Sequence, residues 1–164
     1  AAGLDPDKDI QPQSDSFGDA STKMQDGHID AACNVLAVPA SSIIEMTTSM
    51  KLSYVNISDE ILATLQETEP YFVRKVIPAG TYDGQDEDIN TICKAALYCR
   101  ADMDEETVYQ ITKAFYESGD VIAAAHATGK EVQLEGCLEG ITTPIHPGAA
   151  RYFTEMGIEV PNNG

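Results

Sequence analysis

Basic residues are scarce in this sequence, which has 10 lysines and arginines against 27 aspartates and glutamates and a formal net charge of −17. Nucleic-acid binding needs clustered basic side chains that neutralise phosphates, and electrostatic docking on anionic lipid needs them too. The composition therefore argues against both kinds of partner. Solubility is the simplest interpretation of such acidity. An anionic ligand stays compatible with it, because a local pocket can oppose the global charge.

Long hydrophobic runs are also missing. No apolar run approaches the ~20 residues of a membrane-spanning helix, so we expect no membrane span in this chain. The first ten residues, "AAGLDPDKDI", lack the basic start and apolar stretch of a signal peptide. We therefore expect either a cytosolic protein or a mature or trimmed piece. Hydrophobic residues make up 43% of the 164 positions, which predicts one folded domain with a sizeable core.

Motifs for metal binding and nucleophilic catalysis are absent as well. The sequence has no C-x-x-C pair, no H-E-x-x-H motif and no G-x-S-x-G turn, and the acidic run from Asp83 to Asp88 lacks the spacing of an EF-hand loop. We expect no metal, no cofactor and no catalytic residue. The four cysteines are expected to be buried thiols that act as small hydrophobes, with a disulfide as the alternative: Cys33, Cys93, Cys99 and Cys137.

The first seventy residues favour an α/β fold. Apolar or alternating runs predict strands near Ile10, at 28–36 and at 52–55. Each run is followed by a helical segment. Ser14 or Asp15 caps the first helix and Gly27 ends it, Pro39 lies near the first turn of the second, and Ser58 caps the third. This alternation predicts a mostly parallel sheet with helices on its faces.

The second half of the chain reads as two strands followed by helices. Strands are predicted at 71–77 and at 89–99. Asp104 is a candidate cap for a long helix with acidic residues in its first turn. Two short helices are expected over 119–129 and 131–141, and a last helix closes the chain.

The loop after the strand expected at 28–36 is the first candidate ligand site. In open α/β sheets, ligands bind outside the carboxyl ends of strands, often against helix N-termini. Asn34 can orient a polar ligand group, and Ser41 and Ser42 with their backbone N–H groups can receive a carboxylate. The alternative is a plain strand-to-helix turn.

Five segments, in this order, resemble the carboxyl-terminal half of the TAXI-type solute receptors, which are the extracytoplasmic binding subunits of TRAP transporters. The segments are "DGHIDAA", "VPASSIIEM", "IPAGTYDGQDEDINTI", "DEETVYQITKAFYE" and "PIHPGAARYFTEMG". The resemblance implies a type II periplasmic-binding-protein fold, in which two α/β lobes close on a ligand in the cleft between them. It also implies a periplasmic, non-enzymatic protein. Such a protein binds a small carboxylated solute such as glutamate and hands it to TRAP membrane subunits.

The same resemblance implies a domain arrangement and a set of ligand contacts. Residues 1–140 are expected to form the second lobe, with hinge-crossing strands near 71–99, and residues 141–164 a joint and a carboxyl-terminal helix. Because family members are longer, this chain is expected to be a fragment. The expected ligand contacts are Asn34, Val38, Tyr82 and Arg100. Arg100 and Arg74 are candidate partners of a solute carboxylate, with a surface ion pair as the alternative.

The stretch from Thr142 to Gly157 is interpreted as a structural joint. Prolines stiffen it, Gly148 relieves crowding as the helix begins, and Arg151 is expected to pair with Glu155 on the helix face. Tyr152 and Phe153 are expected to supply packing area. Two alternatives to solute binding stay open. One is a small acidic α/β enzyme that uses His146 with a cysteine, and the other is a stand-alone interaction module.

Overall fold

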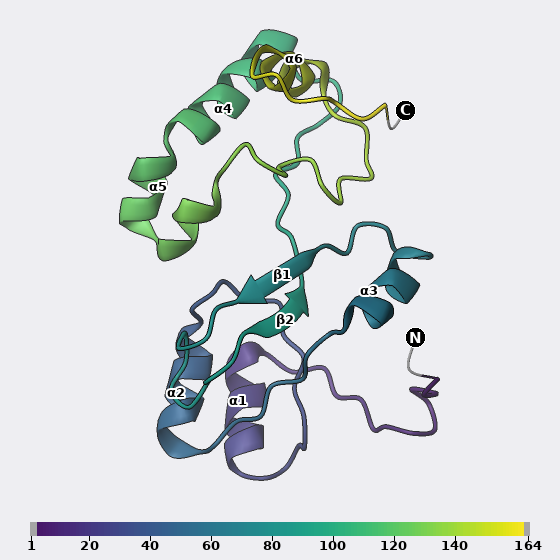
Figure 1. Ribbon diagram of the computed structural model, residues 1–164, viewed down its shortest axis with the longest axis vertical. Helices are drawn as coiled ribbons and strands as arrows, with labels where there is room; N and C mark the ends of the chain where they lie inside the picture. Colours follow the sequence, from purple (N-terminus) through teal and green to yellow (C-terminus); the bar gives the residue numbers. More distant parts are fainter. Residues whose placement is uncertain (1–2, 163–164) are drawn as a thin grey trace. The chain divides into compact units, whose positions relative to one another are not determined.

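The computed structural model describes residues 3–162 and divides the chain into two compact units, with the boundary between Cys93 and Lys94 (Figure 1). The first unit contains α1 (Phe17–Gln25), α2 (Ser41–Ser49), α3 (Asp59–Gln66), β1 (Arg74–Ile77) and β2 (Ile89–Ile92). The second unit contains α4 (Glu105–Glu117), α5 (Gly119–Ala125), the 3₁₀ helix η1 (Ala127–Glu131) and α6 (Pro147–Glu155). The protein is therefore of mixed α/β class.

The sheet differs from the predicted one. β1 and β2 pair antiparallel, with Arg74 opposite Ile92 and Ile77 opposite Ile89. Over residues 3–162 they are the only strands, so no parallel sheet is seen there. β2 also bonds to the segment before α3: the backbone N–H of Ile57 donates to the Asn90 carbonyl at 2.9 Å.

Several runs predicted as strands have no regular secondary structure. These predictions are wrong for the runs at Ile10, 28–36 and 52–55, and the strand expected at 89–99 ends at Ile92. An apolar run becomes a strand only where a neighbour takes its backbone hydrogen bonds. In the described part of the chain, residues 29–39 make no backbone–backbone hydrogen bond. The short helix expected over 131–141 is also absent, since turns occupy that stretch.

Most helix ends follow the prediction closely. Ser58 caps α3 by accepting from the Ile61 N–H at 3.2 Å, and Asp104 caps α4 by accepting from the Thr107 N–H at 2.9 Å. The cap of α1 is Ser16, close to the predicted Ser14 or Asp15. These caps form because donor and acceptor lie within three residues of each other.

Gly27 ends α1 as predicted. It has a φ of +72°, and its N–H donates to the Met24 carbonyl while the next N–H donates to the Lys23 carbonyl. This pair of bonds is the Schellman arrangement, which favours glycine at the left-handed position. Pro39, expected in the first turn of α2, lies two residues before that helix and follows a cis peptide bond.

The second unit is built on the packing of α4 against α6. Val108 is 4% exposed, and Tyr152 and Phe153 are 2% and 6% exposed. Tyr116 stacks on Tyr152 with ring centroids 6.1 Å apart, and it meets Phe153 edge-on. The predicted packing role of Tyr152 and Phe153 is confirmed.

The core of the first unit is small. Its buried apolar side chains are Ala40, Met46, Leu62, Tyr82 and Ile89. Large apolar side chains elsewhere in this unit stay exposed, with Val55 at 83% and Val35 at 68%. The sizeable core predicted from composition is therefore not formed among the described residues. No helix among residues 3–162 is long and apolar enough to cross a membrane.

Candidate functional site

Tyr82 connects the loop Cys33–Pro39 with the loop that follows β1. Its hydroxyl oxygen accepts a hydrogen bond from the Ala40 backbone N–H at 3.0 Å. Its ring stacks on Tyr54, with centroids 6.0 Å apart and an interplanar angle of 17°. Tyr82 is only 6% exposed, so it contributes a buried wall rather than an open contact. The structure thus brings Tyr82 to the end of the loop that carries Asn34 and Val38.

Gln85 holds Tyr82 in place. It is 5% exposed, and its side-chain oxygen accepts from the Tyr82 N–H at 3.2 Å. Its Nε2 donates to the carbonyls of Pro78 at 2.9 Å and Glu87 at 2.8 Å. The sequence analysis missed this residue, because glutamine is usually exposed. The turn sequence "YDGQ" marked the loop but not the inward direction of the amide.

The N-terminus of α2 is open. Ala40 is the N-cap and has no side-chain oxygen, so no side chain accepts from the first turn. Within residues 3–162, no acceptor is found for the backbone N–H groups of Ser41 and Ser42. Two unpaired N–H groups at a helix start, together with the helix dipole, suit an anionic group. Asn34 and Val38 are half-buried in the loop that leads to this helix.

Tyr54 adds a second unsatisfied polar group. Its hydroxyl is buried and lacks a hydrogen-bond partner among the described residues. Burial raises the pKa of Tyr54, and the neighbouring Tyr82 adds to the shift. The hydroxyl therefore stays protonated at neutral pH and is available as a donor. We use the name Tyr82 site for the stacked Tyr82 and Tyr54, the Ser41 and Ser42 N–H groups, and the predicted contacts Asn34 and Val38 in the adjoining loop.

The two predicted guanidinium groups are engaged in ion pairs. Arg100 meets Asp102 through two bonds of 2.8 and 2.6 Å, and its side chain is 81% exposed. Arg74 pairs with Asp59 at 2.7 Å and also donates to the Ile57 carbonyl. This arrangement matches the alternative of a surface ion pair. A role for Arg100 in ligand binding stays a prediction.

His146 caps α6 in the structure. Its Nδ1 accepts from the Gly148 N–H at 3.2 Å, and its Nε2 lies 3.1 Å from the Met103 carbonyl oxygen. Because a carbonyl can only accept, the proton of the neutral ring belongs on Nε2. Nε2 therefore joins the start of α6 to the chain just before α4, while Nδ1 caps α6 itself, which supports the predicted structural joint.

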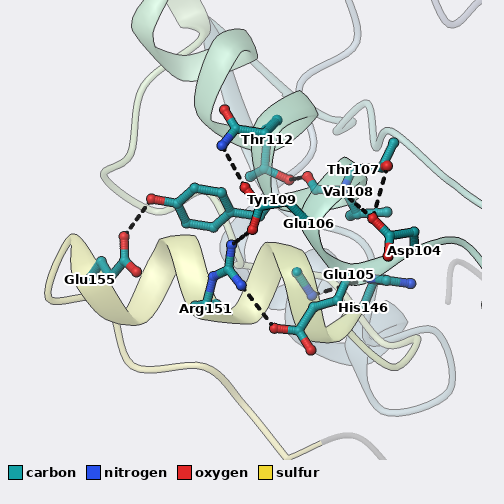
Figure 2. Close-up of polar contacts among 12 residues, drawn as sticks. Asp104, Glu105, Glu106, Thr107, Val108, Tyr109, Thr112, His146, Arg151 and Glu155 are labelled. Carbon is teal, nitrogen blue, oxygen red and sulfur yellow. Dashed lines mark hydrogen bonds and ion pairs between the residues drawn. The ribbon is translucent and has the colours of Figure 1, made fainter.

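The pairing predicted between Arg151 and Glu155 is wrong. Arg151 instead reaches α4, where it pairs with Glu105 at 3.1 Å and Glu106 at 2.6 Å (Figure 2). Its guanidinium also lies 3.9 Å from the centroid of the Tyr109 ring. Glu155 accepts from the Tyr109 hydroxyl at 2.7 Å. Arg151 and Glu155 therefore each bond to a residue of α4.

An open cavity of about 400 Å³ lies in the first unit. It is lined by residues 47–52 at the end of α2 and by Asp83 and Gly84. Its volume is within the range of small-molecule sites. The hydroxyls of Thr47 and Thr48 donate to carbonyls of their own helix, and Lys51 and Asp83 add charged groups to the lining. The cavity adjoins Tyr82 along the chain through Asp83.

The cysteines are all free thiols. Cys33 and Cys99 are exposed, which corrects the prediction of buried thiols, while Cys93 and Cys137 are half-buried. Burial raises the pKa of the Cys137 thiol. The exposure of Cys33 and Cys99 follows from the missing strands, because both residues lie in runs that were expected to enter a sheet.

Comparison with known protein families identifies the family of this chain. The model of the NMT1-like family matches residues 1–157. The chain belongs to the NMT1-like family. This family is related to periplasmic solute-binding proteins, and its members are typically binding proteins rather than enzymes. They are usually extracytoplasmic, and the family suggests a periplasmic-binding-like fold.

Proposed function

We propose that this NMT1-like protein is the extracytoplasmic solute-binding subunit of a TRAP-type transporter. It binds a small carboxylated solute, such as glutamate or a related organic acid, and delivers it to the TRAP membrane subunits. The family match over residues 1–157 carries the binding role. The resemblance of five collinear segments to TAXI-type receptors supports the transporter type. On the same resemblance, residues 1–140 form the second lobe and residues 141–164 the joint and closing helix.

The Tyr82 site gives this proposal a chemical basis. The solute carboxylate accepts from the open N–H groups of Ser41 and Ser42, where the helix dipole stabilises negative charge. The buried hydroxyl of Tyr54 donates to the solute, which satisfies a group that otherwise lacks a partner. Asn34 orients a polar group of the solute, and Val38 contributes apolar contact. Arg100, which pairs with Asp102 in the structure, stays a proposed carboxylate-binding residue on the family resemblance alone.

The engagement of His146 favours binding over the enzyme alternative. A general base needs a nitrogen that is free to take a proton from the reacting group. Here Nδ1 accepts from the Gly148 N–H, and Nε2 is held at the Met103 carbonyl. A reaction at His146 would first have to break the cap of α6.

The binding mode predicts the effect of Ser41→Pro. Proline lacks an N–H but is well accepted at the first position of a helix, and Ala40 before it is already extended. The substitution therefore removes one donor without disturbing α2. We expect solute affinity to fall about tenfold, which corresponds to about 1.4 kcal/mol for one hydrogen bond to a charged group. Calorimetric titration with a panel of dicarboxylates and amino acids measures it.

Phe17→Pro is the matched control. Phe17 is the first residue of α1, its preceding residue is also extended, and it lies outside the Tyr82 site. We expect this variant to bind the solute as the natural protein does. Equal losses in both variants would show that helix starts in general matter, rather than the one in the Tyr82 site. If no carboxylate raises the melting temperature of the folded protein, the proposed function fails.

A further inference from the structure

The loop between β1 and β2 is folded around the side chain of Gln85. A hairpin connection can be as short as two residues, whereas residues 78–88 join these two strands. Gln85 is 5% exposed, and it is the only buried amide or charged side chain among residues 3–162. Its Nε2 donates to the carbonyls of Pro78 at 2.9 Å and Glu87 at 2.8 Å, so one amide bonds to both ends of the loop.

Gln85 is bonded to Tyr82 twice. The Tyr82 backbone N–H donates to the Gln85 side-chain oxygen at 3.2 Å, and the Gln85 backbone N–H donates to the Tyr82 carbonyl at 3.2 Å. A buried amide whose polar atoms are all bonded keeps one conformation, since any other conformation leaves a buried polar group without a partner. Gln85 therefore fixes the backbone from which the Tyr82 side chain projects.

Tyr82 in turn holds the end of the loop that contains Asn34 and Val38. Among the described residues, no hydrogen bond is found for residues 29–39. The first hydrogen bond after that stretch runs from the Ala40 backbone N–H to the Tyr82 hydroxyl, at 3.0 Å. The hydrogen bonds thus lead from Gln85 through Tyr82 to Ala40, and the position of the loop end depends on Gln85.

We infer that Gln85 is a positioning residue of the Tyr82 site. It acts through the Tyr82 hydroxyl on the position of Ala40 and of the predicted contacts Asn34 and Val38, and it does not touch the solute itself. Binding residues on loops need a rigid support, and a buried, fully bonded amide provides one. The inference rests on the proposed function, because it assigns Gln85 a role in that binding site.

Gln85→Met tests this role. Methionine fills a similar volume without an amide, so the substitution removes the bonds to Pro78, Glu87 and the Tyr82 N–H. We expect the affinity for glutamate, or for the best binder among the dicarboxylates and amino acids, to fall about tenfold, as for one lost hydrogen bond. Calorimetric titration measures this change.

Gln66→Met is the matched control. Gln66 is the last residue of α3, and its Nε2 donates to the Phe72 carbonyl at 2.7 Å. The substitution removes a glutamine amide from the same unit without changing the Tyr82 site. We expect this variant to bind the solute as the natural protein does. A loss equal to that of Gln85→Met would assign the effect to any lost side-chain hydrogen bond in the unit.

A double-mutant cycle separates positioning from general stability. Tyr82→Phe retains the ring that stacks on Tyr54 and removes the hydroxyl that accepts from Ala40. If Gln85 acts through that hydroxyl, Gln85→Met weakens binding about tenfold in the natural chain and less than about twofold in Tyr82→Phe. A merely structural Gln85 would lower the affinity by the same factor in both backgrounds.

Amide hydrogen exchange tests the same hydrogen bonds without any solute. In Gln85→Met the Ala40 N–H should exchange about tenfold faster, because its bond to the Tyr82 hydroxyl is weakened. The Leu62 N–H, which donates to the Ser58 carbonyl at 2.9 Å at the start of α3, should keep its rate. A substitution that only destabilised the first unit would speed up the exchange of both amides.

The outcomes distinguish this inference from the proposed function. A natural chain that binds no carboxylate overturns the proposed function, and with it the role of Gln85 in binding. Binding in the natural chain together with unchanged Ala40 exchange in Gln85→Met, or with equal affinity losses in both backgrounds, overturns the role of Gln85 alone. If circular dichroism shows that Gln85→Met does not fold, nuclear magnetic resonance of the natural chain decides. The Gln85 side-chain N–H signals must then shift together with the Ala40 signal when the solute is added, and unshifted Gln85 signals overturn the role.

Discussion

At the scale of the residue, Gly148 shows how one position fixes the contact between two helices. A β-carbon placed there would lie 2.2 Å from the Glu105 carbonyl oxygen and 2.7 Å from the Tyr109 nitrogen. Both are backbone atoms of α4 and cannot turn aside as a side chain would. The prediction that Gly148 relieves crowding is therefore correct, and the crowding comes from α4.

Gly148→Ala should destabilise the second unit by about 1–3 kcal/mol, because the added methyl group forces α6 away from α4. Urea unfolding followed by circular dichroism measures this change. Gly18→Ala is the matched control, since Gly18 lies in α1 and has no atom within 4 Å of the added carbon. That variant should be neutral or more stable by up to about 1 kcal/mol. Equal effects at both glycines would contradict the close approach.

At the scale of the element, α4 and α6 are joined by polar contacts around their packed side chains. Arg151 on α6 reaches Glu105 and Glu106, and Glu155 accepts from Tyr109 (Figure 2). The hydrogen bond from Gln110, together with Arg151, holds the pKa of Glu106 below its ordinary value of 4.5. A carboxylate with a lowered folded pKa stabilises the fold above its unfolded pKa, and this contribution is lost as pH falls through the folded value.

Arg151→Met should therefore destabilise the second unit at pH 7 more than in acid below the lowered pKa of Glu106, where that carboxylate is protonated and the ion pair is lost. Urea unfolding at the two pH values measures the difference. Arg100→Met is the control, because Arg100 pairs with Asp102 only two residues away and joins no two elements. A loss from Arg151→Met that is the same at both pH values would assign the effect to packing on Tyr109.

The same scale explains which elements could be predicted. Ser58, Asp104 and Gly27 act on backbone groups within a few residues, so the sequence was sufficient to place the ends of their helices. Strands depend on partners far along the chain. The apolar run 28–36 was predicted as a strand from its side chains alone, but the only backbone–backbone hydrogen bond found for it among the described residues joins His28 to the end of α1.

At the scale of the whole molecule, the chain consists of two units joined near residue 94. The segment 94–99 is exposed throughout and has no regular secondary structure, although its apolar composition predicted a strand. Leu97 and Tyr98 are 71% and 74% exposed. In the described chain, no backbone–backbone hydrogen bond holds this segment. Such a segment is readily accessible to a protease.

Brief digestion with chymotrypsin should therefore cut first after Leu97 or Tyr98 and release two fragments that correspond to the units. Mass spectrometry identifies the cut sites. Replacing both residues with serine should slow this first cut without changing the circular dichroism spectrum. Early cleavage within α4 or between β1 and β2 would contradict the division into two units.

Some residues of the candidate site could be selected from the sequence, and others are recognised only in the folded chain. The sequence analysis selected Asn34, Val38 and Tyr82, and the structure brings Tyr82 to Ala40 at the end of the same loop. Their role in binding stays a prediction. Tyr54 and Gln85 were missed, because only the folded chain shows that a tyrosine hydroxyl lacks a partner or that a glutamine amide points inward.

The sequence by itself determined the acidity of this protein, the positions of most helix ends and the membership in a family of solute-binding relatives. Those features depend on composition, on contacts within four residues and on the order of motifs. Only the tertiary structure decided that β1 and β2 pair antiparallel, that Arg151 binds α4 rather than Glu155, and that Tyr82 is buried. Each of these depends on which distant residues lie close together, and the spacing along the chain does not specify that.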